Sequence, residues 1–154
     1  MGNKIMKSKI FFLLFFLIYP SFLYSHVNHY NKIKTIEMDI LRNGKKVGYN
    51  KYAFIAKGNY LVVENETNFE TKIIGLNLLT INAFSTETYK NGRLVKYKSR
   101  TYQNKKKKYN DLIFDENKKI YNIVGSSFSG TAPSNAVIGN WWNHNILQSD
   151  VIIS

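Results

Sequence analysis

The sequence predicts a mainly β protein, an antiparallel meander that forms a curved sheet or an open half-barrel, with one short helix near the C-terminus. Apolar and polar residues alternate through most of the chain after residue 33, which is the period of a half-buried strand. The strongest short-range signal for a two-residue hairpin turn, Asn-Gly, occurs at Asn43-Gly44 and at Asn91-Gly92. The predicted strands reach about ten residues, and long consecutive antiparallel strands curl to limit their exposed edges.

The first 25 residues have the organisation of a secretory signal peptide. Lys4, Lys7 and Lys9 precede the apolar run Ile10–Tyr19, which is the order of a basic region and an apolar region before a cleavage site. The apolar run is short for a spanning helix, which needs about 20 residues. We therefore expect residues 1–25 to be removed and residues 26–154 to form a single β-rich domain in the periplasm or outside the cell. An uncleaved membrane anchor is the alternative.

Composition narrows the chemistry and the partners. The chain has no cysteine, which excludes thiol chemistry, thiolate metal sites and disulfides. Without residues 1–25 it keeps 19 basic and 10 acidic residues, a net charge of +9. This excess suits solvated strand faces, and it also suits attraction to an anionic envelope surface. Nucleic acid is not an expected partner, because the chain is predicted to be exported.

The first predicted hairpin joins Lys34–Leu41 to the return strand Lys46–Ala56 through Asn43-Gly44. A regular two-residue turn would place Ile36 opposite Lys51 and so break the apolar pairing of the hairpin. A β-bulge is therefore expected if Ile36 is to face an apolar residue.

The middle of the chain is expected to continue the meander. Tyr60–Glu70 alternates, and Glu64, Glu66 and Glu70 share one face, which predicts a solvated face. Gly75 interrupts the apolar segment Thr71–Leu79 and predicts a bulge or a bend between strands.

The central hairpin is predicted from Thr80–Tyr89 and Leu94–Thr101. The Asn91-Gly92 turn sets Tyr89 opposite Leu94, and a regular register then sets Glu87 opposite Lys96. Opposite charges across a ladder stabilise it by a few tenths to about 1 kcal/mol.

The C-terminal third is less regular. Strands are predicted at Tyr109–Phe114 and Lys119–Val124, and Gly125–Ala136 is predicted to be a loop of the kind that covers a site or links elements. One or two helical turns are expected within Asn140–Gln148. Val151–Ile153 starts a β-like run that lacks the charges or proline of a natural edge. We therefore expect the domain to be C-terminally incomplete, or its missing strands to come from a second copy or a partner.

No motif in the sequence indicates catalysis. The serines after Gly125 lack the strand–turn–helix context of a nucleophile elbow, and no glycine-rich phosphate loop occurs. The sequence therefore predicts a non-enzymatic protein with no cofactor and no metal site. An enzyme that uses Glu87 or His144 is a less favoured hypothesis.

The aromatic content indicates binding instead. The chain has 11 Tyr, 10 Phe and 2 Trp, and aromatic side chains line pockets for apolar ligands. We expect Tyr89, Tyr97, Trp141 and Trp142 to bind a lipid-like or other amphipathic molecule within the curved sheet. Ordinary core packing of these rings is the simpler interpretation.

The same features also fit two further hypotheses. One is an envelope structural or interaction module that contacts an anionic surface or a protein partner. The second is an outer-membrane barrel, which the basic face of the Leu94–Thr101 strand disfavours. The oligomeric state is left open.

Several short pieces carry a family resemblance. They are Glu87, Tyr89, Asn91-Gly92, Leu94, Ser99, Thr101, Ala132-Pro133 and Trp142-Asn143. In this order and spacing the segment from Lys72 to Gln148 resembles the exported bacterial domain-of-unknown-function family 6134. The resemblance implies a curved antiparallel sheet and no particular activity. It also implies further strands after the Trp-Asn segment, whereas this chain ends at Ser154.

Overall fold

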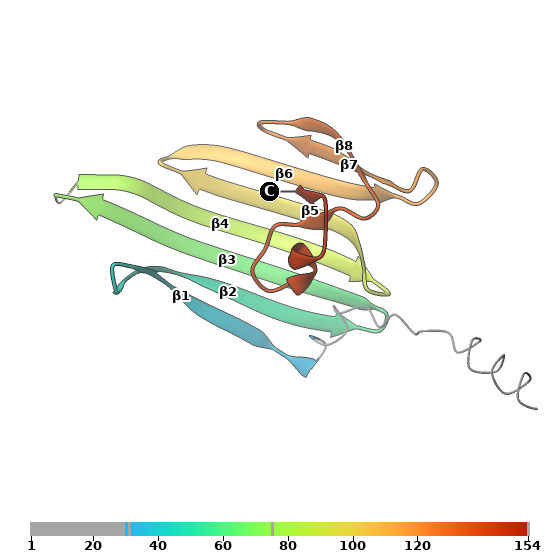
Figure 1. Cartoon of the computed structure of the whole chain (residues 1–154), viewed down its shortest axis with the longest axis horizontal. Coiled ribbons are helices and arrows are strands. Elements are labelled where there is room, and N and C mark those ends of the chain that lie inside the picture. The colour runs from blue at the N-terminus through green and yellow to red at the C-terminus, as the bar shows by residue number, and fades with distance from the viewer. Residues whose placement is uncertain (1–29, 31, 75, 154) are drawn as a thin grey trace, which may run out of the picture.

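The computed structural model describes residue 30, residues 32–74 and residues 76–153 (Figure 1). The predicted signal peptide and the bend predicted at Gly75 lie outside the described residues. Eight strands form one sheet in which sequence neighbours are also spatial neighbours and every pair is antiparallel. They are β1 (Thr35–Arg42), β2 (Lys45–Lys57), β3 (Tyr60–Ile73), β4 (Leu76–Lys90), β5 (Arg93–Gln103), β6 (Lys106–Asp115), β7 (Ile120–Gly125) and β8 (Ser129–Pro133).

The predicted meander is confirmed in its open form. Strands β1 and β8 are the two edges of the sheet in the described residues, and the sheet does not close into a barrel. The longest strands, β2 to β5, lie in the middle, where each one is paired on both sides.

Both predicted Asn-Gly turns are present. Asn43 and Gly44 have φ of 51° and 74°, and Asn91 and Gly92 have φ of 49° and 79°. Positive φ at both central residues is what the favoured two-residue hairpin turn requires. The expected bulge of the first hairpin lies between Ile40 and Leu41, and the shifted register sets Ile36 opposite Tyr52.

The predicted pair of Glu87 with Lys96 is wrong. Tyr89 does face Leu94, but the register shifts after this pair, so that Thr88 faces Lys96 and Glu87 faces Tyr97. A one-residue shift exchanges the faces of every later side chain. It keeps Lys96 exposed and places Tyr97 on the same face as the buried Glu87.

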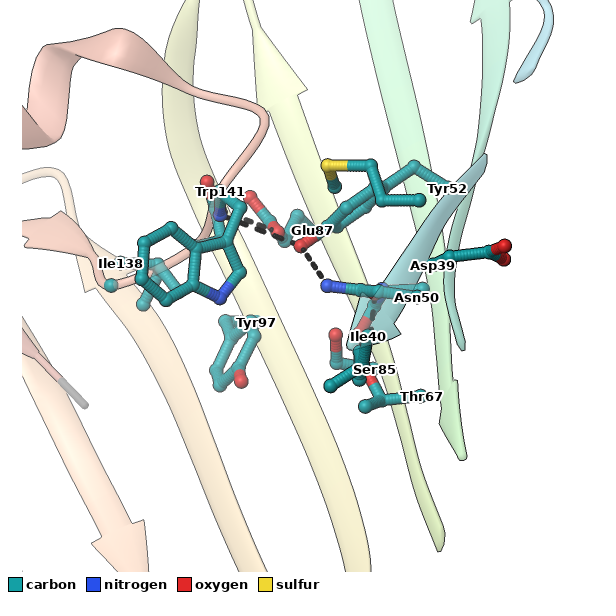
Figure 2. Close-up of a pocket in the computed structure, with 14 residues that line it drawn as sticks. Asp39, Ile40, Asn50, Tyr52, Thr67, Ser85, Glu87, Tyr97, Ile138 and Trp141 are labelled. Carbon is teal, nitrogen blue, oxygen red and sulfur yellow. Dashed lines mark hydrogen bonds between the residues drawn. The ribbon is translucent and has the colours of Figure 1, made fainter. Parts of the chain in front are cut away.

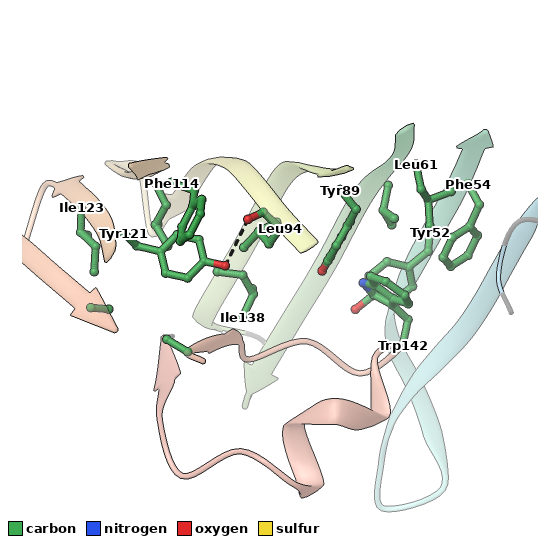
Figure 3. Close-up of a cluster of buried hydrophobic side chains, with 14 residues drawn as sticks. Tyr52, Phe54, Leu61, Tyr89, Leu94, Phe114, Tyr121, Ile123, Ile138 and Trp142 are labelled. Carbon is green, nitrogen blue, oxygen red and sulfur yellow. Dashed lines mark hydrogen bonds between the residues drawn. The ribbon is translucent and has the colours of Figure 1, made fainter. Parts of the chain in front are cut away.

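The two faces of the sheet differ. On the inner face, large apolar side chains gather at one end of the strands and form the core with residues of the chain that follows β8 (Figure 3). The buried members are Tyr52, Phe54, Leu61, Val63, Tyr89, Leu94, Leu112, Phe114, Tyr121, Ile123, Ala132, Ala136, Ile138 and Trp142. The outer face carries charged and polar residues together with exposed aromatic and aliphatic residues on β5–β7.

Residues 134–153, which we call the C-terminal arm, cross the inner face. The arm contains β9 (Val137–Ile138), the 3-10 helix η2 (His144–Leu147) and β10 (Ile152–Ile153), and it lies in front of the sheet in Figure 1. The short helix expected here is confirmed as this 3-10 turn. Strand β10 pairs with β9 in parallel, and Ile152 stays 49% exposed.

The loop predicted over Gly125–Ala136 is wrong in part, because Ser129–Pro133 forms the edge strand β8 against β7. The small residues of this segment gave no strand signal in the sequence. Pro133 stands at the last position of this edge strand, where a proline is tolerated because no hydrogen bond from its nitrogen is needed.

Candidate functional site

A cavity of about 470 Å³ lies between the inner face of β1–β5 and the arm (Figure 2). Strand β1 contributes Met38 and Ile40 to its wall, and the arm contributes Ile138 and Trp141. These four residues form an apolar wall because the bulge in the first hairpin and the crossing arm place them on opposite sides of the same hollow.

The floor of the cavity is a network of amides and hydroxyls on neighbouring strands. Asn65 donates a hydrogen bond to the Asn50 Oδ1, and Thr67 Oγ1 donates to the same oxygen at 3.1 Å. Asn50 Nδ2 in turn donates to the Tyr52 hydroxyl at 3.0 Å. Each side chain therefore holds the next, and these hydrogen bonds fix the positions of the polar groups on the floor.

Glu87 of β4 is the buried acidic group of this site. It is 1% exposed, yet it contributes to the cavity wall. Its Oε1 accepts from Asn140 Nδ2 at 2.8 Å and from Trp142 Nε1 at 3.2 Å, and its Oε2 accepts from the Tyr89 hydroxyl at 2.5 Å. Two of the three donors belong to the arm, so this carboxyl group fastens the arm to the sheet.

Burial sets the titration of these groups. Burial raises the pKa of Glu87 above its ordinary value of 4.5, against the opposing effect of the hydrogen bonds from Tyr89, Trp142 and Asn140. Burial and the neighbouring Glu87 carboxylate raise the pKa of the Tyr89 phenol well above its ordinary value. Both tyrosine and glutamate thus favour their neutral forms relative to the same groups in water.

Residues 38–154 match the model of the family described as a domain of unknown function, DUF6134. The chain belongs to this family. The match begins at Met38, the first residue of the cavity wall, so the whole candidate site lies in the DUF6134 segment. No curated protein matches the chain, and no solved structure does either.

The four aromatic residues predicted to bind a ligand have different places in the DUF6134 domain. Tyr97 lines the cavity, and Trp141, which is 83% exposed, forms part of its wall. Tyr89 and Trp142 are buried and are not among the residues that line the cavity, but both donate hydrogen bonds to Glu87, which does line it.

Trp142 anchors the arm. Its ring makes edge contacts with Tyr30, Phe54 and Tyr89 at centroid distances of 5.0, 5.3 and 5.7 Å. The Tyr30 hydroxyl donates to the Trp142 carbonyl at 2.7 Å. The two adjacent tryptophans therefore lie in different places: Trp142 packs in the core, and Trp141 lines the cavity.

Sequence reasoning missed the polar part of the site. The sequence offered one signal for these residues. Polar side chains, those of Asn50, Asn65 and Thr67, stand at inward-facing positions of the alternating pattern, where an apolar residue is usual. Asn140 lies in the arm, and nothing in its local sequence connects it to a strand more than fifty residues away along the chain.

A second hollow of about 690 Å³ adjoins the first one on the inner face. It lies between β4–β8 and β10, and it shares Asn65, Ser85 and Tyr97 with the first cavity. The two hollows therefore form a continuous surface along the sheet beneath the arm.

In the part of the chain that the structure describes, no cluster of three His, Asp or Glu residues is placed to hold a metal ion. The described residues also contain no helix of sufficient length and apolarity to cross a membrane.

Proposed function

We propose that this DUF6134 protein is an exported, non-enzymatic binding protein that holds a small amphipathic molecule between the inner face of its sheet and the C-terminal arm. The observation that carries the proposal is the cavity of about 470 Å³ with an apolar wall and a fixed polar floor. Ligand sites are usually concave, largely apolar and supplied with a few well-placed polar groups.

The arrangement of the polar groups favours binding over catalysis. Asn50, Asn65 and Thr67 hold one another, and the Glu87 oxygens accept three hydrogen bonds from neutral donors. Groups positioned in this way orient a bound molecule at little entropic cost. Export is supported by the predicted signal peptide at residues 1–25.

The proposal is tested with a neutral apolar dye, N-phenyl-1-naphthylamine, whose fluorescence rises in an apolar site. We expect saturable binding to the purified protein, and weaker binding after Ile40→Glu, which places a charge in the apolar wall. The matched control is Ile113→Glu on the outer face, where the side chain is 57% exposed and the substitution leaves binding unchanged. Equal binding by both variants, or no saturable binding at all, would reject the proposal.

A second candidate function, association with an anionic envelope surface, is favoured by the outer face of β5–β7. Tyr102, Tyr109, Ile113 and Val124 are 41–57% exposed there, and Lys96 and Lys98 project on the same face of β5. Exposed aromatic and aliphatic groups beside basic residues suit a layer of anionic lipid headgroups.

This second candidate predicts sedimentation with vesicles that contain anionic phosphatidylglycerol and none with purely zwitterionic vesicles. Binding should weaken as salt increases, because exposed charges are screened. The double variant Lys96→Glu and Lys98→Glu should lose the association, whereas Lys45→Glu and Lys57→Glu on β2 should keep it. Association that ignores both salt and the β5 lysines would contradict this candidate.

A further inference from the structure

The cavity differs in charge from the rest of the chain. The chain has 22 Lys and Arg against 10 Asp and Glu. Of the fourteen described residues that line the cavity, none is basic and two are acidic, Asp39 and Glu87. Asp39 is already paired with Lys46 at 2.6 Å and is about half exposed. Glu87 is therefore the acidic group of the cavity that forms no ion pair within the described residues.

The groups hydrogen-bonded to the Glu87 carboxyl group are all uncharged. Its hydrogen-bond partners are the Tyr89 hydroxyl, the Asn140 amide and the Trp142 indole, all of them neutral donors. An ionised carboxylate offers about four acceptor positions, and the three donors occupy three of them. A buried carboxylate without a cationic partner is costly in free energy, and a bound cation would remove that cost.

Aromatic side chains line the same cavity as this carboxyl group. Figure 2 shows Glu87 among the side chains of Trp141, Tyr97 and Tyr52, which belong to the arm, β5 and β2. The faces of tryptophan and tyrosine attract organic cations, above all quaternary ammonium groups. A carboxylate together with aromatic faces is the chemistry that recognises an amine rather than an anion or a neutral head group.

We propose that this cavity selects a molecule with a quaternary or protonated amine, set against Glu87 and the rings of Tyr97 and Trp141, with an apolar part along Met38, Ile40 and Ile138. The inference rests on the proposed binding function and names the class of its ligand. The net positive charge of the chain would repel such a ligand in general. Preference for a cation would therefore have to come from the site itself.

The test uses amphiphiles that share one octyl chain and differ in the head group. Isothermal titration calorimetry at about 0.15 M salt, where exposed charges are screened beyond roughly 8 Å, measures octyltrimethylammonium, octyl glucoside and octyl sulfate below their micelle concentrations. We expect the cationic amphiphile to bind about tenfold or more tightly than the glucoside, the equivalent of one desolvated contact between an organic cation and an aromatic face. Tetramethylammonium, which has the same charged group without the octyl chain, is measured as well. It distinguishes a small free ammonium ion from a lipid-like ligand with the same head group.

The decisive variant is Glu87→Gln, which keeps the shape and an acceptor oxygen but removes the charge. The preference for octyltrimethylammonium over octyl glucoside, measured as the ratio of the two affinities for the same variant, should fall below about twofold. The matched control, Glu64→Gln on the exposed face of β3, should keep the full preference. Trp141→Leu leaves Glu87 and the core untouched, because Trp141 is 83% exposed; it should weaken the cation more than the glucoside.

The failures of the two proposals are distinguishable. Equal affinity for the cationic and neutral amphiphiles, or tighter binding of octyl sulfate, would overturn the amine inference and leave the binding function standing. Binding of none of the octyl compounds would overturn both. If Glu87→Gln does not fold, an unchanged preference in Trp141→Leu overturns the inference and a reduced one supports it.

Discussion

Glu87 shows how one residue joins the sheet to the arm. Its carboxyl group lies on β4, between Val63 of β3 and Tyr97 of β5, and it accepts hydrogen bonds from Asn140 and Trp142 of the arm. It is therefore both part of the cavity wall and the polar fastening of the segment that closes the cavity. Its loss should affect stability and binding together.

We predict that Glu87→Ala lowers the free energy of unfolding by about 3 kcal/mol, because it leaves three buried donors without an acceptor. Urea denaturation followed by tryptophan fluorescence measures this change. The control, Glu64→Ala, removes an exposed carboxylate from the outer face and should change stability by no more than about 0.5 kcal/mol. A loss of under about 1 kcal/mol for Glu87→Ala would contradict this role.

We predict that Glu87 also makes the stability of the folded protein depend on pH. The pKa of Glu87 is raised above 4.5 in the folded protein by burial, so the folded state holds this proton more tightly than the unfolded state does. Its stabilising contribution is then fully present below about pH 4.5 and is lost as the pH rises through the folded pKa. The unfolding free energy of the wild type relative to Glu87→Gln should therefore decrease from about pH 4.5 toward neutral pH. An increase over this range would refute the assignment.

At the scale of single elements, Trp142 is the main apolar anchor of the C-terminal arm. Trp142 is 3% exposed and contacts three aromatic rings, whereas its neighbour Trp141 is 83% exposed. Strands β9 and β10 are two residues each and supply little pairing of their own. The arm is therefore held by the side chains of Trp142 and Asn140 more than by its backbone.

We predict that Trp142→Ala costs about 3–5 kcal/mol, as expected for truncation of a buried tryptophan, and that Trp141→Ala costs no more than about 0.5 kcal/mol. Hydrogen exchange should quicken in Trp142→Ala at the arm amides of Val137 and Gly139, which bond to the carbonyls of Val151 and Ile153. The amides of β3 and β4 should exchange more slowly than these. Equal costs for the two tryptophan variants would show that the arm is not anchored as described.

The elements also show what the sequence could predict. The hairpins of β1–β2 and β4–β5 were predictable because Asn-Gly fixes a turn and its flanking alternation fixes the strands. The true partner of Glu87 was not, because the regular register already paired opposite charges, so that nothing in the sequence indicated the shift between Thr88 and Tyr89. Strands β8 and β9 were missed, since small residues hide the first and a two-residue strand has no detectable period.

The candidate site was predictable only in its aromatic part. Tyr97 and Trp141 were expected at a cavity, and they line one. The contribution of Asn140 depends on the arm crossing the sheet, which is a tertiary event. Trp142, predicted with Tyr97 and Trp141 as a ligand-binding residue, lies in the core, where the junction of the arm and the sheet buries its large ring.

At the scale of the whole molecule, the sheet separates two surfaces of different character. The inner face holds the core and the cavity under the arm, and the outer face carries the lysines of β5 beside exposed aromatic and aliphatic groups. In the two proposals, the outer face contacts the envelope and the inner face holds the ligand. The two proposals therefore concern opposite faces and can be tested separately.

Export itself makes a simple prediction. The chain expressed in a Gram-negative host should be recovered from the periplasm with His26 as its first residue, as N-terminal sequencing or intact mass would show. Leu14→Arg interrupts the apolar run and should leave the uncleaved chain in the cytoplasm, because a charge in the apolar region impairs signal recognition. Recovery of the uncleaved wild type from the membrane fraction would favour the anchor instead.

The most direct test of the binding account is to map where the cationic probe contacts the protein. A ¹H–¹⁵N NMR titration with octyltrimethylammonium follows the Trp141 indole N–H and the side-chain amides of Asn50 and Asn65, all of which belong to the cavity. We predict that these signals shift together and saturate, while the backbone amides of Asp111 and Ile113 on β6 stay in place. Shifts confined to β6, or no saturable shift at the cavity, would contradict the account.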